Sequence, residues 1–411
     1  MKISFFKWFY PGMGVKRWII LAILGIIMIG VGSAVYISEV FILGKIVDLT
    51  TVILGIALIF VSIYKIFSSF IKVILPPGNK DLATILYEKR HLERGPKIVV
   101  VGGGTGLSVL LHGIKEFTSN IRAIVTVADS GGSSGRLREQ FDVLPPGDIR
   151  NCLVALADAE PLMQKLFQFR FKEGGELEGH NFGNLFITAM TKVTGDFEEA
   201  VKESSKVLAI RGQVIPSTLE RVTLVAEYTD GSSIKGEDKI PKKNLPIRKV
   251  TLTPQDVPAA EEALKAIEEA EVIILGPGSL YTSIIPNLLI KGITDAIANS
   301  SAMKIYICNV MTQSGETDGY KASDHIRALI SHSGKKDIVN FCVVNTAAKV
   351  PKELLSKYEQ QKSFPVVADS KNIKELGCTV VEGNLISTAD YLRHNSEKLT
   401  KIIISLILRK R

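Results

Sequence analysis

Two long apolar runs stand at the start of the chain, ahead of a region with a different pattern. Residues 18–37 contain no charged side chain, and residues 49–71 contain only Lys65. A helix that crosses a bilayer needs roughly 20 apolar residues. The pattern therefore predicts an N-terminal membrane region, residues 1–75, with two transmembrane helices at about 18–37 and 49–71. We expect residues 38–48, which carry Glu39, Lys45 and Asp48, to form the loop between them. A cleaved signal peptide is excluded because the first apolar run is too long and no small-residue cleavage site follows it.

Basic residues surround this pair of predicted helices. They lie before the first helix and after the second, whereas the loop has a single lysine, Lys45. The positive-inside rule then places both ends of the pair in the cytoplasm. We expect a multi-pass protein of the cell membrane whose remaining residues lie in the cytoplasm. Pro76, Pro77 and Gly78 end the second helix, and residues 76–96 are predicted to be a linker.

From residue 97 onwards, short apolar runs alternate with amphipathic segments of helical length. The runs at 98–101, 121–127, 272–275, 305–309, 341–345 and 379–381 are predicted strands. This alternation is typical of an α/β domain with a mainly parallel sheet between two layers of helices. We therefore predict one Rossmann-like three-layer domain over residues 97–408. Residues 222–233, with the Asp230-Gly231 turn, are expected to form a β-hairpin beside the main sheet.

The first predicted strand runs directly into glycines, KIVVVGGGTGL at 97–107. A strand that ends in glycines and opens a helix brings bare backbone N–H groups and the positive end of a helix dipole to one point, which suits a phosphate. The dinucleotide fingerprint is only partly matched, because Leu107 occupies its third glycine position. A P-loop is excluded, since no Gly-Lys-Ser/Thr follows. The alternative is a tight turn without a ligand.

The second predicted strand also ends in small and polar residues. Asp129 lies about twenty positions after the glycines, where a dinucleotide fold holds a ribose hydroxyl. The Gly-Ser run at 130–135 offers further backbone donors, and Arg136 or Arg138 could pair with a phosphate. The alternative is a polar loop with a solvated arginine.

Three further polar clusters precede predicted helices. Asp148 follows a Pro-Pro-Gly turn, where an aspartate caps a helix, holds Mg²⁺ or acts as a base. His180 lies in a turn among asparagines and glycines, and is either a structural or a ligand-facing residue. Gly276 to Tyr281 follow another apolar strand, and Tyr281 either stacks on a ligand or packs in the core. Ligands of such sheets bind beyond the carboxyl ends of the strands, and these clusters converge there.

Composition narrows the function classes. Of 411 residues, 50 are Lys or Arg and 42 are Asp or Glu, a net charge of +8 that is concentrated at the chain ends. No basic stripe with interleaved aromatics is present, which argues against nucleic-acid binding. The four cysteines are isolated, without C-x-x-C spacing, which favours reduced thiols over disulfides or a zinc site.

Six ordered motifs resemble those of the YvcK-like gluconeogenesis factors of bacteria, which are relatives of the 2-phospho-L-lactate transferase (CofD-like) family. The motifs are VVVGGGTGL, TVADSGGSSGRLR, PPGDIRNCL, GHNFGNL, GPGSLYTSIIPNLL and CNVMTQSGETDGY. The resemblance covers residues 97–408. It implies binding of UDP-sugars such as UDP-N-acetylglucosamine and a role in cell shape and wall-precursor supply during gluconeogenic growth. The transferase relatives bind a guanosine nucleotide and transfer phospholactate.

Carried over position by position, the resemblance implies a set of ligand-binding residues. These are Gly102, Gly103, Gly104, Thr105, Gly106, Asp129, Ser130, Gly131, Gly132, Ser133, Ser134, Arg136, Asp148, Asn151, His180, Asn181, Asn184, Gly276, Gly278, Ser279, Tyr281 and Arg393. Arg393 is expected to close the pocket over a diphosphate. The transferases typically carry paired aspartates where this chain has Asp129-Ser130, which weakens the case for transferase chemistry and for a resident metal.

Two hypotheses follow. The first is a membrane-tethered UDP-sugar-binding regulator, without catalytic residues or certain cofactors, that acts through a protein partner in cell-wall synthesis and forms homo-oligomers. The second is a Mg²⁺-dependent transferase of a phosphorylated group, with Asp129 and Asp148 as its candidate catalytic residues. An NAD(P)-dependent oxidoreductase is a weaker third, because the third glycine is missing.

Overall fold

The computed structural model describes residues 15–38, 41–74, 90–159, 161–346, 352–387 and 393–410. The chain divides between residues 90 and 91 into two compact units, which are described separately. Most of the predicted linker lies outside the described residues.

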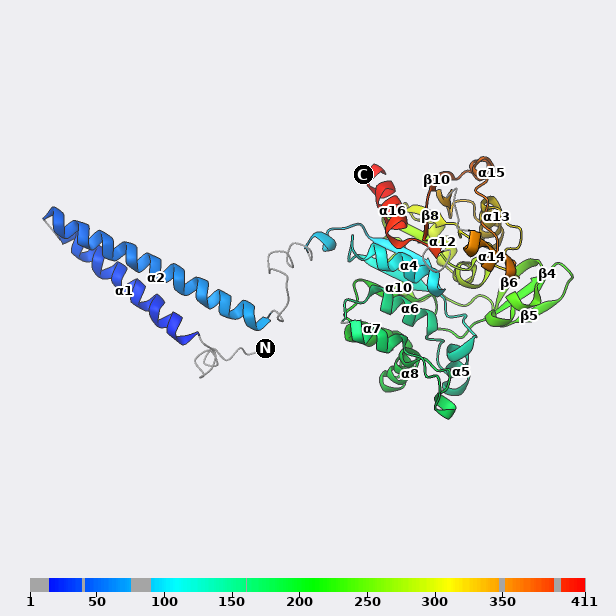
Figure 1. Ribbon diagram of the computed structural model, residues 1–411, viewed down its shortest axis with the longest axis horizontal. Coiled ribbons are helices and arrows are strands. Elements are labelled where there is room, and N and C mark those ends of the chain that lie inside the picture. The colour runs from blue at the N-terminus through cyan, green and yellow to red at the C-terminus, as the bar shows by residue number, and fades with distance from the viewer. Residues whose placement is uncertain are drawn as a thin grey trace. The chain divides into compact units, whose positions relative to one another are not determined.

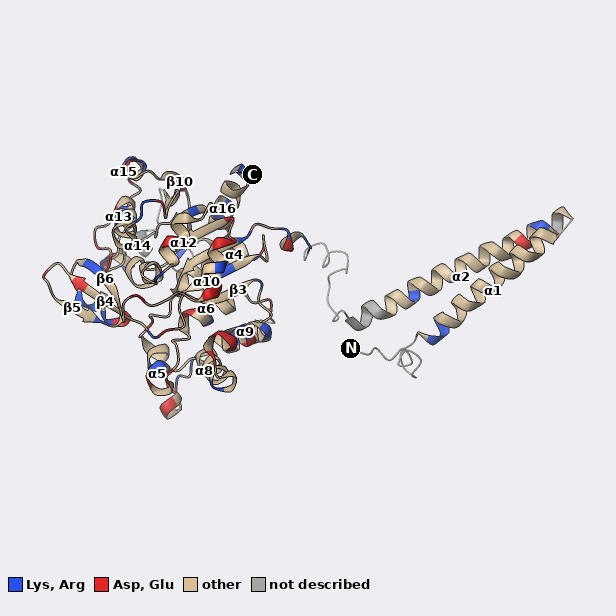
Figure 2. Cartoon of the chain, turned by 180° about the vertical axis from the view of Figure 1, so that it is seen from behind, with Lys and Arg blue, Asp and Glu red and all other residues tan. Residues whose placement is uncertain are grey.

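The first unit is a pair of long helices, α1 (Lys16–Ser38) and α2 (Ile42–Ile74) (Figure 1). Both are long and apolar enough to cross a membrane: Lys16–Ser38 and Gly44–Ser69 each contain an 18-residue stretch of mean hydropathy 2.5. Figure 2, in which charged residues are coloured, shows how few of them these helices contain. The helices approach closely at glycines, since a β-carbon on Gly25 would lie 2.7 Å from the carbonyl oxygen of Gly55. The predicted loop at 38–48 was wrong, because α2 begins at Ile42: Lys45 and Asp48 are part of its first turns, where charges are compatible with a helix.

The second unit contains a seven-stranded sheet in the order β10-β9-β8-β7-β1-β2-β3, and every neighbouring pair is parallel. The strands are β1 (Ile98–Gly102), β2 (Ile121–Val125), β3 (Gln213–Pro216), β7 (Val272–Leu275), β8 (Met303–Ile307), β9 (Phe341–Asn345) and β10 (Thr379–Gly383). The predicted α/β fold with a parallel sheet is confirmed. The edge strand β3 was not among the predicted strands.

Helices cover both faces of this sheet (Figure 1). The helices of this unit are α4 (Gly104–Ile114), α5 (Gly132–Phe141), α6 (Gly147–Leu156), α7 (Pro161–Gln168), α8 (Phe182–Thr194), α9 (Phe197–Val207), α10 (Glu261–Glu268), α11 (Ile285–Leu288), α12 (Ile293–Asn299), α13 (Ala322–Ser333), α14 (Lys352–Gln360), α15 (Ser370–Glu375) and α16 (Ser396–Lys410). Crossovers between parallel strands are right-handed. The α4 crossover and the α12 crossover run in opposite directions along the sheet, so these two helices cover opposite faces.

A smaller antiparallel sheet lies beside the main one, in the order β5-β4-β6. Its strands are β4 (Thr223–Tyr228), β5 (Ser233–Lys235) and β6 (Ile247–Thr253), and the predicted hairpin corresponds to β4 and β5. Between β5 and β6, two short turns, η3 (Glu237–Lys239) and η4 (Pro241–Lys243), return towards the carboxyl ends of the main strands. The third sheet has two antiparallel strands, β11 (Ile386–Ser387) and β12 (Arg393–His394).

Candidate functional site

The strand order reverses between β1 and β7. From β1 the chain proceeds to β2 and β3 on one side, whereas from β7 it proceeds to β8, β9 and β10 on the other. The loops that leave β1 and β7 therefore diverge, and a crevice opens beyond their carboxyl ends. Both loops are glycine-rich, Gly103–Gly106 after β1 and Gly276–Ser279 after β7.

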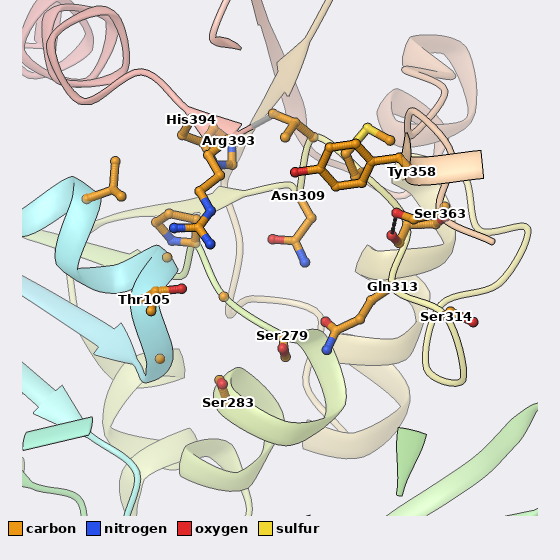
Figure 3. Close-up of a pocket in the computed structure, with 18 of the residues that line it drawn as sticks. Thr105, Ser279, Ser283, Asn309, Gln313, Ser314, Tyr358, Ser363, Arg393 and His394 are labelled. Atoms are coloured by element: carbon orange, nitrogen blue, oxygen red, sulfur yellow. Dashed lines mark hydrogen bonds between the residues drawn. The ribbon is translucent and has the colours of Figure 1, made fainter. Parts of the chain in front are cut away.

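A cavity of about 600 Å³ lies at this crossover point (Figure 3). The two glycine loops line one side, and Arg393 and His394 of β12 line another. The loop after β8 and the segment that contains Tyr358 complete it. The full lining is Gly103, Gly104, Thr105, Gly106, Val109, Pro277, Gly278, Ser279, Ser283, Asn309, Val310, Met311, Thr312, Gln313, Ser314, Tyr358, Gln361, Ser363, Arg393 and His394. Its volume suits a ligand of nucleotide size.

The two glycine loops pack directly against each other. A β-carbon on Gly106 would lie 2.8 Å from the carbonyl oxygen of Pro277, and one on Gly278 would lie 3.1 Å from that of Gly103. Gly104 has a φ of +69°, which disfavours other residues. Three of the four residues at 103–106 carry no side chain, so a ligand can approach the backbone at the N-terminus of α4, where the helix dipole favours an anionic group. The backbone of Gly104 also hydrogen-bonds to Asp148.

The cavity wall carries mainly uncharged polar groups. Arg393 supplies a permanent positive charge beside the glycine loop (Figure 3). Its neighbour His394 is neutral, because burial lowers its pKa to about 4, and its Nε2 donates to the carbonyl of Cys308 at 3.2 Å. Donors for an anion thus lie on one side of the cavity, and hydroxyl and amide groups lie on the others.

A second polar cluster lies on the other side of the first glycine loop. A β-carbon on Gly103 would lie 2.5 Å from Asp148 Oδ2, and one on Gly147 would lie 2.8 Å from Asp129 Oδ2. Burial, helped by the charge of Asp129, raises the pKa of Asp148 to about 7, and burial also raises the pKa of Asp129. Two carboxyls therefore share a buried polar region that a cation or a proton would stabilise.

Neighbouring helices complete this cluster. Ser133 Oγ lies 3.2 Å from His180 Nδ1 and accepts from the backbone N–H of Asn181 at 3.2 Å. Asn184 Nδ2 donates to Ser134 Oγ at 3.4 Å. Arg150, whose pKa burial lowers to about 10, donates to Asn151 Oδ1 at 2.6 Å.

The small antiparallel sheet adds an acid that the sequence interpretation missed. Burial raises the pKa of Glu237 to about 8, and Asp129, Asp148 and Glu316 contribute to the shift. The adjacent Asp238 accepts from Ser130 Oγ at 2.9 Å. Glu237 lies more than a hundred positions after Asp129, in a segment with no glycine-rich strand end, so no local pattern pointed to it. Among the described residues, no group of three His, Cys, Asp or Glu side chains is placed to hold a metal ion.

The structure divides the predicted ligand-binding residues into four groups. Those that line the cavity are Gly103, Gly104, Thr105, Gly106, Gly278, Ser279 and Arg393. Those of the cluster behind the glycine loop are Asp129, Ser130, Gly131, Gly132, Ser133, Ser134, Asp148, Asn151, His180, Asn181 and Asn184, and Arg136 lies at its edge, donating to the carbonyl of Glu178 at 2.8 Å. Gly102 and Gly276 shape the strand ends. Tyr281 packs in the core, with its hydroxyl 2.7 Å from that of Tyr320.

Several cavity residues were missed. Ser283, Asn309, Gln313 and Ser314 follow apolar strands, so the strand-end rule that identified the glycine loops also applies to them. Tyr358 and Ser363 carry no comparable signal, because they belong to a helix and the loop after it.

Comparison with known proteins finds a matching family model and several similar proteins that share one name. Residues 98–386 match the family model "2-phospho-L-lactate transferase CofD". A Nostoc protein named "Putative gluconeogenesis factor" is 46% identical, over 98% of this chain and 92% of its own length. The Bacillus subtilis "Gluconeogenesis factor" is 48% identical, over 76% of this chain and 98% of its own length.

A solved structure shows the same fold. The crystal structure of a UPF0052-family protein from Bacillus halodurans matches with a TM-score of 0.73 and 49% identity, over 75% of this chain and 99% of its own. A protein that corresponds to the second unit alone therefore folds independently. By the family match and these relatives, the chain belongs to the CofD family and, within it, groups with the proteins named gluconeogenesis factors.

Proposed function

We propose that this protein is a membrane-anchored regulator that binds a UDP-sugar of the UDP-N-acetylglucosamine type in the cavity between β1 and β7. Through that ligand it supports cell shape and wall-precursor supply during gluconeogenic growth. The observation that carries the proposal is the pairing of an anion site, formed by the Gly103–Gly106 loop and Arg393, with walls of uncharged hydroxyl and amide groups. A diphosphate suits the first, and a nucleoside and a sugar suit the second.

The membrane anchor is supported by the aromatic and basic residues of the helix pair. Lys65 Nζ lies 5.7 Å from the centre of the Trp18 ring, and Lys45 Nζ lies 5.8 Å from that of Tyr36. Tryptophan, tyrosine and lysine concentrate at membrane interfaces. Eighteen residues of helix separate Trp18 from Tyr36, about 27 Å at 1.5 Å per residue, close to the thickness of a bilayer core. In our proposal these pairs mark the two interfaces, with Trp18 and Lys65 on the cytoplasmic side.

A calorimetric titration tests the proposal. The full chain in detergent is titrated with UDP-N-acetylglucosamine, GDP and NAD, with and without Mg²⁺, and the nucleotides are then analysed. We expect metal-independent binding of the UDP-sugar and its recovery unchanged. If the UDP-sugar binds neither with nor without Mg²⁺, the proposal is overturned.

A second candidate is a Mg²⁺-dependent transferase of a phosphorylated group, with Asp129 and Asp148 as its acidic residues. It is favoured by the proximity of these two half-buried carboxyls, whose mutual repulsion a divalent cation would relieve. Preference for GDP with Mg²⁺, or any turnover, would support it. Asp129→Ala would then abolish the metal dependence. The binding hypothesis predicts little loss of affinity for a ligand held in the cavity, which Asp129 does not line; a loss of roughly 1.5–3 kcal/mol would place the ligand in contact with Asp129 instead.

A further inference from the structure

Gln313 lies in the loop after β8, and its side chain extends towards Ser279 at the floor of the cavity (Figure 3). Its backbone N–H donates to Thr317 Oγ1 at 2.9 Å, which holds the start of the loop. Its side-chain Nε2 lies 2.6 Å from Glu316 Oε1. An amide side chain has a donor end and an acceptor end, and coordinates alone do not distinguish them. The partner of the amide decides which end faces the cavity.

Glu316 is that partner, and its own contacts determine its role. The side chain is 3% exposed. Thr282 Oγ1 donates to Glu316 Oε1 at 3.2 Å, and the backbone N–H groups of Tyr281 and Thr282 also donate to the carboxyl. The oxygen that faces Gln313 is therefore an acceptor already held by donors. In the ionised carboxyl this oxygen can be joined only by another donor, which is the –NH₂ end of the amide.

We infer that Glu316 is a positioning residue that orients the amide of Gln313, so that Gln313 Oε1 faces the cavity and accepts a hydrogen bond from a hydroxyl or N–H group of the ligand. This rests on the proposed function and adds to it a requirement for a donor on the part of the ligand beside Gln313. Among the described residues, the side chain of Gln313 makes its hydrogen bond through Nε2, and no group donates a hydrogen bond to its Oε1. The second oxygen of Glu316, Oε2, is buried and has no hydrogen-bond partner. The hydrogen bonds that hold the carboxyl are therefore all made by Oε1.

The hydrogen-bonding role of Gln313 is opposite to that of the glycine loop. The loop and Arg393 offer donors to an anion, whereas Gln313 offers an acceptor. A ligand must then present an anionic group at one end and a donor at the other, as a nucleoside diphosphate sugar does through its sugar hydroxyls or its uracil N–H. A ligand with an acceptor at the same place would meet oxygen against oxygen and bind less well.

Four variants of the full chain test the inference by titration with UDP-N-acetylglucosamine and with UDP. Gln313→Leu removes the acceptor and is expected to weaken binding about tenfold. Glu316→Leu frees the amide and is expected to have a similar effect, and the double variant should be no weaker than Gln313→Leu alone. Glu316→Gln keeps an oxygen for the Thr282 donors and should bind like the unchanged chain. Additive losses, or unchanged affinity of Gln313→Leu, would overturn the inference.

Comparison of UDP with UDP-N-acetylglucosamine identifies which part of the ligand donates the hydrogen bond to Gln313 Oε1. A loss with UDP itself assigns the donor to the nucleoside, and a loss confined to UDP-N-acetylglucosamine assigns it to the sugar. Unfolding of each variant is measured in parallel, so that lost folding is recognised.

A ligand-free measurement separates this inference from the proposed function. Glutamine side-chain amides are labelled with ¹⁵N in the 91–411 region, and the Gln313 signal is assigned by its loss in Gln313→Leu. In the 91–411 region without substitutions, and in its Glu316→Gln variant, we expect the Gln313 amide to have a chemical shift displaced from that of an exposed glutamine and slow hydrogen exchange with water. In Glu316→Leu we expect the chemical shift and the exchange rate of an exposed glutamine. A signal that does not respond to Glu316→Leu refutes the orientation even if the UDP-sugar binds. If the UDP-sugar does not bind, the proposed function fails, and this signal still decides the orientation.

Discussion

The side-chain amide of Asn287 donates to the carbonyl of Gly102 at 3.1 Å, which ties the end of β1 to a helix 185 residues further along the chain. The same nitrogen donates to the carbonyl of Ser283 at 2.7 Å, so one buried amide links the end of β1 to the helical turn that follows the second glycine loop. The cavity depends on this cross-link, because its two loops belong to strands that are neighbours only in the folded sheet.

Asn287→Leu should destabilise the second unit. The substitution keeps the size of the side chain but removes both hydrogen bonds of the buried amide, so that the Gly102 carbonyl keeps only the backbone N–H of Thr126 as a donor. We expect this loss to lower the free energy of unfolding by about 1–3 kcal/mol. Urea unfolding of the 91–411 region measures this. Asn299→Leu, at an exposed position at the end of α12, is the control and should change little. Equal stability of the two variants would contradict the role of Asn287.

Gly106→Ala tests the close approach of the loops. The new methyl group would lie 2.8 Å from the carbonyl oxygen of Pro277, so the loops must separate. We expect a loss of about 1–3 kcal/mol in stability, the range for overpacking, together with weaker binding of UDP-N-acetylglucosamine. Gly30→Ala makes the same change where no atom lies within 4 Å of the new carbon, and serves as the control. Calorimetry that gives both variants the same affinity would argue against the loop as a ligand contact.

Arg393→Gln tests the anion site. If the guanidinium contacts a diphosphate, its loss should cost about 1.5–3 kcal/mol of binding, the range for hydrogen bonds to charged groups. The effect should shrink for uridine, which has no phosphate. Arg409→Gln, an exposed position near the end of α16, provides the matched control. An equal loss for uridine and for the UDP-sugar would place the role of Arg393 elsewhere.

The raised pKa values of two half-buried acids predict a pH dependence of stability. The pKa of Asp148 is raised from 3.8 to about 7 in the folded protein, so between these values the folded state holds a proton that the unfolded chain has lost. Stability should therefore be greatest at low pH within this window and fall as the pH rises through about 7. Glu237, with a pKa of about 8, acts in the same direction.

Asp148→Asn cannot ionise, so its stability should fall less between pH 5 and pH 8 than that of the unchanged 91–411 region. Urea midpoints across this range make the measurement. Asp256→Asn, at an exposed turn, should retain the full decline. A decline as large in Asp148→Asn as in Asp256→Asn would show that Asp148 is not the titrating group.

Removal of residues 1–90 tests the membrane anchor. We expect the full chain to stay with membranes after carbonate washing and the 91–411 region to be soluble. The two should bind UDP-N-acetylglucosamine equally, because every residue of the cavity lies in the second unit. Release of the full chain by carbonate would contradict a membrane-spanning hairpin.

Much of this protein is determined by local sequence. The apolar runs specify the two long helices and the strands of the sheet, since burying an uninterrupted apolar segment requires a membrane or the interior of a parallel sheet. The β7 strand was predicted with its observed bounds, Val272–Leu275. The glycines at 102–106 mark a junction of strand and helix as predicted, but β1 includes Gly102 and α4 begins at Gly104, earlier than the predicted start at Leu107. The beginning of α2 was missed because charged residues were interpreted as a loop.

The tertiary structure decided which loops meet. Hydrophobic periodicity shows that a segment is a strand, but not which strand lies beside it, because pairing depends on the path of the chain. The order β7-β1-β2 places Gly106 against Pro277 and puts Asp129 and Asp148 behind the glycine loop, away from the cavity residues with which the sequence had grouped them. The contact of Gln313 with Glu316 is likewise a matter of side-chain geometry. Long-range packing in three dimensions, which leaves no local pattern, therefore assembled the cavity from segments that the sequence could identify only one by one.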